Sequence, residues 1–398
     1  MNKITTLLVL IILTLTVFGQ TETETIKKAN DLISNKKYES AFKLLNNFDP
    51  KNSKPDIVLL KEDIALNYFV SSMMHQMFAL KDLEKNEDIM DYRGKEGLFG
   101  MYGFEINKVL DSLIKIYPSN CKLYKGLGDY YYEVHLKYGG KWLKDDNDLF
   151  KLIEANNKKA IEGNCADFLT YYVLGYVYVA QEKHKDAIPY FLKSIELNHE
   201  YASSFYNLAY AYLYTDDREN ALKYARKSLE LYTDISYKGD AARMLGQIFL
   251  EMKDDKNALE NYELSDKIDP GNYYTTKALL NLYLKSGSIK AEKTMNAFFN
   301  IAPTNPTIYN DLEEIYFKLT KEDVLIAFYN GLFSPFKDND KVTGNLNFYL
   351  GRIYLDKDKK LAKEFFLKAK DIFAKVYAKN HPVFKAIEDG IKQSEKLE

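Results

Sequence analysis

Apolar residues recur with helical spacing through the middle of the chain. Each apolar stretch is followed by a short polar turn and then by a second apolar stretch, as around residues 182–185 and 215–218. A period near 3.6 residues predicts amphipathic helices, and a short polar turn predicts that the second helix runs back along the first. The pattern therefore predicts helix–turn–helix units.

These units repeat at a fixed spacing. One copy carries its signature at Leu174, Gly175, Tyr178, Ala187, Phe191, Ser194 and Leu197. The same positions recur 34 residues later at Leu208, Ala209, Tyr212, Ala221, Ala225, Ser228 and Leu231. A third copy begins at Leu245, after three residues have been added to the connection. One helix pair cannot cover its own apolar face, so stacked neighbours must form a continuous core.

A 34-residue unit with these residue types resembles the tetratricopeptide repeat. The resemblance implies an all-α, right-handed superhelical solenoid of antiparallel helix pairs. Weaker copies on both sides predict about nine hairpins and a closing helix over 382–396. We expect four segments: a signal peptide at 1–19, degenerate hairpins over 20–118, the clearest repeats over 119–271, and degenerate repeats with the capping helix over 272–398.

The first twenty residues have the pattern of an export signal. Lys3 precedes a largely apolar run over 4–18, and Gly19 places a small residue before Gln20. An uncleaved anchor is the alternative, although a spanning helix needs roughly 20 apolar residues. We expect a mature chain without a transmembrane segment, either periplasmic or extracellular at the cell surface.

Composition narrows the chemistry. The hydrophobic content of 46% is enough for a large apolar core. The formal net charge is −2, so there is no electrostatic argument for binding to nucleic acid. The two cysteines and five histidines show no metal-ligand spacing, and no catalytic motif is present in the sequence. We therefore expect no metal, no cofactor and no enzymatic activity.

Cys121 and Cys165 each follow an asparagine just before the first helix of a unit. Stacked helices lie about 8–10 Å apart, and a disulfide needs Cα atoms within about 7 Å. The turn before each helix can close that gap. The spacing predicts a disulfide between the two units, with two buried free thiols as the alternative.

Two consecutive units carry extra residues between their helices, at 84–100 and 135–147. Both insertions fall at the same kind of turn, so they should emerge on one edge, near each other. Insertions in repeat proteins often form a binding face, which makes Tyr92, Arg93 and Trp142 candidates. The alternatives are mobile surface loops, and a Trp142 that plugs the end of its helix pair.

The resemblance also implies that the first helix of each pair lines a concave groove in which ligands lie. The inward positions would be Tyr172, Tyr176, Tyr206, Tyr210, Tyr214 and Arg243. Tyrosine combines a large apolar ring with a hydroxyl tip, which suits an extended peptide or a partner helix. Packing between neighbouring first helices is the alternative.

The leading hypothesis is an exported scaffold that binds a protein or peptide partner through this groove and the insertion edge. The alternative is a helical-repeat protein of the cell envelope that binds a solute or glycan. An enzyme is the least supported reading.

Overall fold

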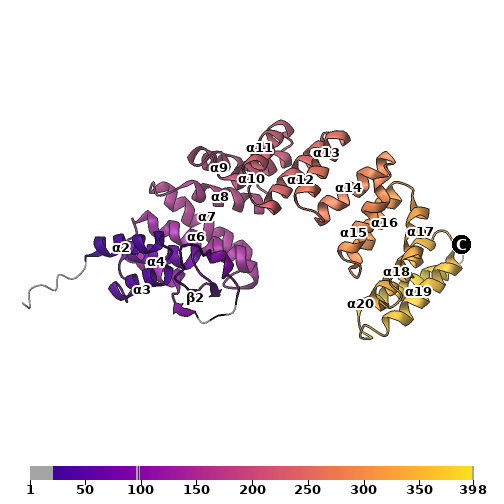
Figure 1. Ribbon diagram of the computed structural model, residues 1–398, viewed down its shortest axis with the longest axis horizontal. Helices are drawn as coiled ribbons and strands as arrows, with labels where there is room; N and C mark the ends of the chain where they lie inside the picture. The colour runs from indigo at the N-terminus through magenta and orange to yellow at the C-terminus, as the bar shows by residue number, and fades with distance from the viewer. Residues whose placement is uncertain (1–20, 96, 98, 397–398) are drawn as a thin grey trace, which may run out of the picture. The chain divides into compact units, whose positions relative to one another are not determined.

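The computed structural model describes residues 21–95, 97 and 99–396, so the predicted signal peptide at 1–19 lies outside the described residues. This part contains 19 α-helices, α2 to α20, which in sequence make nine consecutive pairs and a final single helix (Figure 1). The all-α helical-repeat class is therefore confirmed, with the expected number of hairpins. Among the described residues, no helix has the length and apolar character needed to cross a bilayer.

The chain divides into two compact units, which meet in sequence between Asp217 and Arg218. This division falls inside the predicted 119–271 segment. In a solenoid each repeat contacts only its neighbours, so sequence patterns do not mark such a boundary.

The first unit holds nine helices and a small sheet among its described residues. The helices are α2 (Glu22–Ser34), α3 (Tyr38–Phe48), α4 (Pro55–Asn67), α5 (Ile106–Ile116), α6 (Cys121–Tyr138), α7 (Asp146–Glu162), α8 (Phe168–Ala180), α9 (His184–Leu197) and α10 (Ala202–Tyr214). The strands are β1 (Ser71–Met73), β2 (Met77–Leu80) and β3 (Gly100–Gly103).

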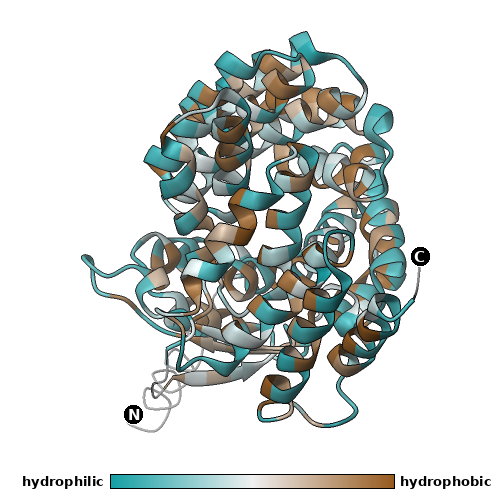
Figure 2. Ribbon diagram, turned by 90° about the vertical axis from the view of Figure 1, so that its right-hand side faces the viewer, coloured by the Kyte–Doolittle hydropathy of each residue, from teal (hydrophilic) through white to brown (hydrophobic). Residues whose placement is uncertain are grey.

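The second unit is entirely helical over its described residues. Its helices are α11 (Arg218–Leu231), α12 (Ile235–Glu251), α13 (Asp255–Ile268), α14 (Tyr273–Ser286), α15 (Lys290–Ile301), α16 (Pro306–Lys318), α17 (Glu322–Leu332), α18 (Asp340–Tyr354), α19 (Lys359–Phe373) and α20 (Pro382–Ser394). Figure 2 shows that single helices carry brown apolar and teal polar residues on different sides, as amphipathic helices do.

Local signals explain why the helices begin and end where they do. Asp167 caps α8, because its carboxylate accepts the amide of Thr170 at 2.9 Å while the Thr170 hydroxyl accepts the amide of Asp167 at 3.3 Å. The polar turns between paired helices contain a residue in the left-handed region, such as Glu182 at φ 60° and Asp216 at φ 67°. These two residues are 34 positions apart, so the repeat extends to backbone conformation.

A buried serine joins each of the second helices α9 and α13 to the first helices on either side of it. The Ser194 hydroxyl donates to the Phe168 carbonyl at 2.8 Å and lies 2.8 Å from the Ser204 hydroxyl on the next first helix. In the second unit Ser265 repeats the arrangement with Gly239 and Thr275. A small residue permits the close approach, and the hydrogen bonds satisfy its buried hydroxyl.

The structure differs from the expected bounds of both insertions. The first runs from residue 68 to residue 105 rather than over 84–100, and it contains the antiparallel sheet in the order β1-β2-β3 with the short 3₁₀ helix η1 (Ile89–Asp91). Strands of three and four residues form only through pairing with one another. An alternating pattern over so few residues is too short to be recognised in the sequence. The sheet is tied to α3, because the Asp82 carboxylate accepts the backbone amide of Ser40 at 3.0 Å.

The second insertion is shorter than expected. Helix α6 continues through His135 to Tyr138, so only residues 139–145 are inserted rather than 135–147. The helix ends where Gly139 adopts φ 56°, a conformation that glycine enters without steric cost. The 3₁₀ helix η2 (Gly139–Lys141) then leads to Trp142.

Candidate functional site

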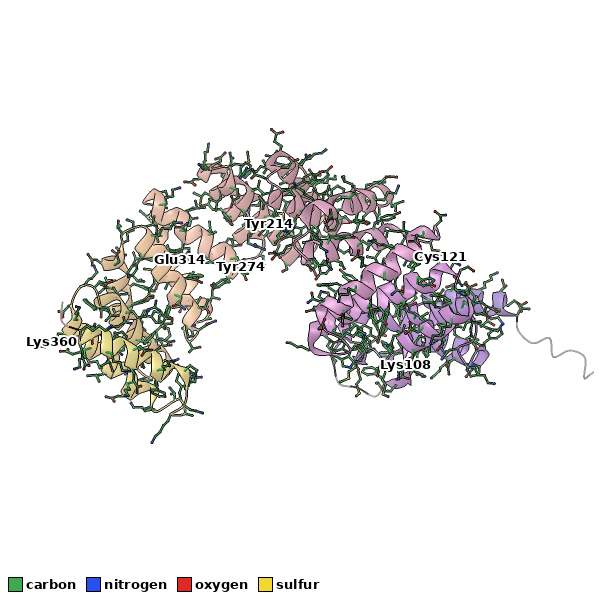
Figure 3. The ribbon with its side chains drawn as sticks, turned by 180° about the vertical axis from the view of Figure 1, so that it is seen from behind. Lys108, Cys121, Tyr214, Tyr274, Glu314 and Lys360 are labelled. Atoms are coloured by element: carbon green, nitrogen blue, oxygen red, sulfur yellow. A yellow bond between two sulfur atoms is a disulfide. The ribbon has the colours of Figure 1, made fainter. Side chains whose placement is uncertain are left out.

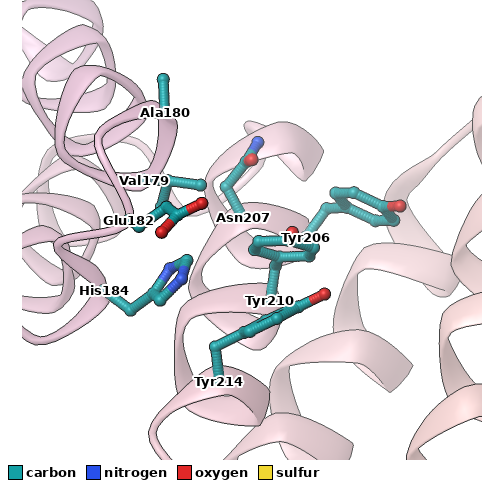
Figure 4. A pocket seen from close by; sticks show the side chains of 8 residues that line it. All are labelled: Val179, Ala180, Glu182, His184, Tyr206, Asn207, Tyr210 and Tyr214. Carbon is teal, nitrogen blue, oxygen red and sulfur yellow. The ribbon is translucent and has the colours of Figure 1, made fainter.

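A pocket of about 610 Å³ lies in the first unit beside the ends of α8 and α10. We call it the tyrosine pocket, and Figure 4 shows its lining. The lining residues are Val179, Ala180, Glu182, His184, Tyr206, Asn207, Tyr210 and Tyr214. It brings together three of the predicted groove residues, Tyr206, Tyr210 and Tyr214.

Stacked rings form one side of the tyrosine pocket. Tyr210 and Tyr214 are four residues apart on α10, which places them on the same helix face with ring centroids 4.5 Å apart. The His184 ring, from the first turn of α9, stacks on Tyr214 at 4.8 Å and meets Tyr210 edge-on at 5.8 Å. Tyr214 is 54% exposed, so this cluster presents an aromatic surface to solvent.

The Tyr210 hydroxyl stays protonated at neutral pH. Burial raises the pKa of Tyr210 to about 12, with a smaller contribution from its hydrogen bond to Tyr214. A neutral phenol both donates and accepts hydrogen bonds. The side-chain amide of Asn207 adds polar character to the lining and donates to the Ser203 carbonyl at 3.0 Å.

Tyr172 does not line an open groove, and its prediction as a groove residue was wrong. It is 8% exposed, and its ring packs against Tyr201 at 5.1 Å and Phe191 at 6.0 Å. The Asn207 amide donates to its hydroxyl at 3.3 Å. Tyr201, which comes directly before α10, covers the Tyr172 ring, so at this position the alternative of packing between neighbouring helices holds.

Tyr176 is half-buried and belongs to a hydrogen-bonded chain that the sequence did not suggest. The Nε2 atom of His135 lies 3.1 Å from the Tyr176 hydroxyl, and its Nδ1 lies 2.8 Å from Asp146 Oδ1. The chain connects α6, the start of α7 and α8. His135 and Asp146 are 11 residues apart with an insertion between them, and no sequence motif marks such a pair.

Arg243 lies in the second unit, whereas the residues of the tyrosine pocket belong to the first. Its Nη2 atom pairs with Asp240 Oδ1 at 2.9 Å, and its guanidinium sits over the Tyr274 ring at 5.4 Å. The arginine is thus engaged within its own unit, on α12 and α14. Tyr274 is 64% exposed and is an aromatic surface residue that the sequence analysis did not single out.

The first insertion lies against the end of α6, from which the second insertion begins. The Lys137 ammonium donates to the Ser72 hydroxyl at 2.7 Å, which links α6 to β1. The Tyr138 ring contacts His75 at 5.4 Å and Trp142 at 5.2 Å. Trp142 is half-buried against this aromatic contact rather than fully exposed.

Tyr92 and Arg93 serve mainly to hold the first insertion in place. Arg93 donates from Nη2 to the Asn67 carbonyl at 2.9 Å, and its guanidinium covers the Phe69 ring at 4.4 Å. The Tyr92 hydroxyl donates to Glu87, and the Lys81 ammonium lies 4.7 Å from its ring centroid. The structure does not bring these residues into the tyrosine pocket.

Cys121 and Cys165 are joined by a disulfide with their Cα atoms 5.7 Å apart. Cys121, labelled in Figure 3, is the first residue of α6, and Cys165 follows α7. The bond joins the first residue of the pair α6–α7 to the segment that leads into α8, which is the pairing that the sequence predicted. Within the described residues, no group of three or more His, Cys, Asp or Glu side chains is arranged to hold a metal ion.

Comparison with known proteins identifies the repeats in the middle of the chain. The model of the tetratricopeptide repeat matches residues 169–201, 202–234 and 244–272. A tetratricopeptide repeat protein from Parabacteroides merdae is similar at 17% identity over 69% of this chain and 99% of that chain, with a TM-score of 0.42. Pseudomonas aeruginosa pilF is similar at 15% identity over 55% of this chain and 96% of that chain, with a TM-score of 0.42.

A third similar structure is the C-terminal part of a repeat-containing protein from Cytophaga hutchinsonii, at 14% identity over 72% of this chain and 93% of that chain, with a TM-score of 0.40. No curated protein matches the chain. The matched repeats coincide with the helix pairs that the 34-residue spacing predicted. Residues 169–272 of the chain thus carry tetratricopeptide repeats.

Proposed function

We propose that this protein is an exported, non-catalytic scaffold that holds an extended segment of a protein partner in the tyrosine pocket. Tetratricopeptide repeats are scaffolds for protein interaction. The observation that carries the finer proposal is the exposed ring of Tyr214, backed by Tyr210 and His184 in an open pocket. Rigid aromatic rings offer a large contact area at low entropic cost, as they do at interface hot spots.

The lining also favours particular chemistry in the partner. Glu182 is exposed at the pocket, so it would favour a basic side chain beside the segment that contacts the rings. The tyrosine hydroxyls and the Asn207 amide can hydrogen-bond to an extended backbone. We therefore propose a segment with an apolar or aromatic residue flanked by a lysine or arginine.

A Tyr214 substitution tests the pocket. Tyr214→Ala should weaken partner binding by about 1–2 kcal/mol, the cost typical of truncating an interface aromatic, with little change in thermal stability because the ring is exposed. Tyr237→Ala is the matched control, since Tyr237 is 60% exposed but lies on α12 outside the pocket. Binding would be measured by calorimetry with a partner identified through a photo-crosslinking residue placed at position 214.

The crosslinking result separates the two functional hypotheses. A covalent polypeptide adduct from position 214, and none from position 237, supports the peptide site. Lack of a polypeptide adduct, together with saturable oligosaccharide binding that Tyr214→Ala abolishes, would replace it with the solute- or glycan-binding alternative.

Export is a separate part of the proposal and has its own test. The apolar run over 4–18 and the disulfide support it, because disulfides persist in oxidising compartments. The mature protein recovered from its native envelope or medium should begin at Gln20 and resist thiol alkylation without reductant. A chain that begins at Met1 with two alkylated cysteines would contradict export.

A further inference from the structure

We propose that a small pocket on α16 and α18 in the second unit binds a primary ammonium group, the head group of a lysine side chain on a partner. The pocket has a volume of about 350 Å³ and is lined by Asn310, Glu313, Glu314, Phe317 and Arg352. The first four lie on α16 at spacings of three and four residues, so they share one face of that helix. The site belongs to the second unit and does not depend on the tyrosine pocket.

Glu313 is a buried carboxylate with one oxygen left over. The residue is 8% exposed, and Arg352 Nη2 pairs with its Oε2 at 2.9 Å. The other oxygen, Oε1, is buried and has no hydrogen-bond partner among the described residues. Arginine and carboxylate frequently pair through both oxygens at once, and a buried acceptor without a donor costs free energy. The open oxygen of Glu313 therefore calls for a second donor, which a ligand can supply.

Arg352 is held in place and does not supply that donor. Its Nη1 donates to Asn310 Oδ1 at 3.0 Å, and its guanidinium lies over the Tyr349 ring at 5.1 Å. The Tyr349 hydroxyl donates to the same Asn310 oxygen at 3.0 Å, so this amide oxygen already accepts two hydrogen bonds. The arginine is thus fixed by three groups while one oxygen of Glu313 stays open.

The lining carries more negative than positive charge. Glu313 and Glu314 place two carboxylates against the single guanidinium of Arg352. Glu314, labelled in Figure 3, has an oxygen 3.3 Å from the Lys277 ammonium of α14, but that ammonium is closer to Asp311 Oδ1, at 2.7 Å. The pocket therefore favours a cation over an anion, which both carboxylates would repel.

The arrangement suits a lysine head group. An ammonium has three donors and no acceptor, so it can bond to the carboxylates of Glu313 and Glu314 together. Phe317 is 42% exposed, and its ring offers the cation an aromatic face. The last torsion of a glutamate side chain is broad, which allows the carboxyl group of Glu313 to turn toward a bound ligand.

The protonation of Glu313 gives this site a distinctive signature. Burial raises the pKa of Glu313 to about 7, and Arg352 acts in the opposite direction with a smaller effect. Tyr349 on α18 and Tyr329 on α17 also interact with Glu313, but burial raises their pKa, so both stay neutral. Glu313 is therefore mostly uncharged below pH 7 and charged above it. Because an ammonium needs the charged form, its binding should release a proton and strengthen as the pH rises.

Two small probes test the site on the full chain. Nα-acetyl-lysine N-methylamide carries the ammonium, and Nα-acetyl-norleucine N-methylamide is its apolar match. In calorimetric titrations the lysine probe should bind up to about 30-fold more tightly at about pH 8.5 than at about pH 5.5, as follows if only ionised Glu313 binds it. Lysine itself, with a pKa of about 10.4, stays charged over this range. Near pH 7, buffers of different ionisation enthalpy should report about half a proton released for each probe bound.

Substitutions in the lining should act in different ways. Glu313→Gln should abolish both the pH dependence and the proton release. Glu314→Gln and Phe317→Leu change exposed side chains, so they should leave the fold intact and each weaken the lysine probe about 2- to 5-fold. These two variants carry the test if Glu313→Gln does not fold. Asp323→Asn is the matched control, since it removes one charge from an 89% exposed side chain outside the lining.

Several results would overturn the proposal. The first is a lysine probe that does not bind, or that binds no more tightly than the norleucine probe. The second is an affinity for lysine that is the same at both pH values. The third is unchanged binding in Glu314→Gln and Phe317→Leu. Equal losses in Asp323→Asn and Glu314→Gln would also reject the pocket, because they would attribute the effect to the general charge of the second unit.

Discussion

At the scale of single residues, buried Lys61 shows how strongly environment governs chemistry. Its side chain is almost fully enclosed at 1% exposure, and its ammonium donates to Asn46 Oδ1 at 2.8 Å and Asn52 Oδ1 at 2.5 Å. It also lies 5.3 Å from the Phe42 ring centroid and 5.0 Å from that of Phe104. Desolvation lowers the pKa of Lys61 to about 8, because burial penalises its charged form.

This pKa predicts a pH-dependent stability. The folded pKa of about 8 lies below the unfolded value of about 10.4, so between these values the unfolded chain holds more protons. Raising the pH through that window should favour the folded state of the wild type by up to about 3 kcal/mol relative to Lys61→Met. Urea unfolding of both proteins at pH 7 to 10 measures the difference; a constant difference would disprove a shifted lysine.

At the scale of elements, complementary sizes set the spacing within helix pairs. A Cβ added at Gly175 would lie 2.6 Å from the Phe191 ring, and one at Gly246 would lie 2.8 Å from the Tyr262 ring. The repeat between these two has alanine at both positions: Ala209 replaces the glycine and Ala225 replaces the aromatic residue. The absent side chain is therefore what admits the ring of the second helix.

Gly175→Ala should destabilise the protein by about 1–3 kcal/mol, because overpacking outweighs the better helix propensity of alanine. Gly331→Ala is the control, since Gly331 lies in α17 with nothing within 4 Å of an added Cβ. That change should be neutral or stabilising by about 0.5–1 kcal/mol. Chemical denaturation measures both, and equal effects at the two positions would refute the packing argument.

At the scale of the whole molecule, each stack of repeats must cover its last apolar face. In the second unit α20 does this: Ile387 is fully buried, and a Cβ at Gly390 would lie 2.6 Å from the Phe366 ring. Phe366 and Phe373 on α19 are each 1% exposed beneath it. The predicted capping helix over 382–396 is thus confirmed as α20, with the burial expected of a cap.

Ending the chain at residue 381 should uncover these rings and destabilise the second unit by about 1.5–3 kcal/mol for each large side chain exposed. Repeats contact only their neighbours, so amide exchange should accelerate in α18 and α19 and stay unchanged in α2 to α5. Hydrogen-exchange mass spectrometry measures this, with a chain ending at Ser394 as the control. Uniform acceleration along the chain would show that the cap acts on the whole protein instead.

The sequence alone determined the repeat, the helix pairs and the cap. These follow from the 3.6-residue period and from the 34-residue recurrence of leucine with a small residue, an aromatic residue, alanine and serine, which are local signals shared by the three central copies. The disulfide partners were also predictable, because only two cysteines exist and both precede first helices. The placement of Tyr206, Tyr210 and Tyr214 on one helix face also follows from the sequence, because they are spaced four residues apart within α10.

Only the tertiary structure decided which of those residues meet solvent. Tyr172 and Tyr214 were both expected to face the groove, but Tyr172 is 8% exposed and Tyr214 is 54% exposed. The β1–β3 sheet and the His135–Asp146 contact likewise depend on partners distant in sequence. Periodicity tells which side of a helix is apolar, but exposure depends on what packs against that side, and that is a property of the assembled chain.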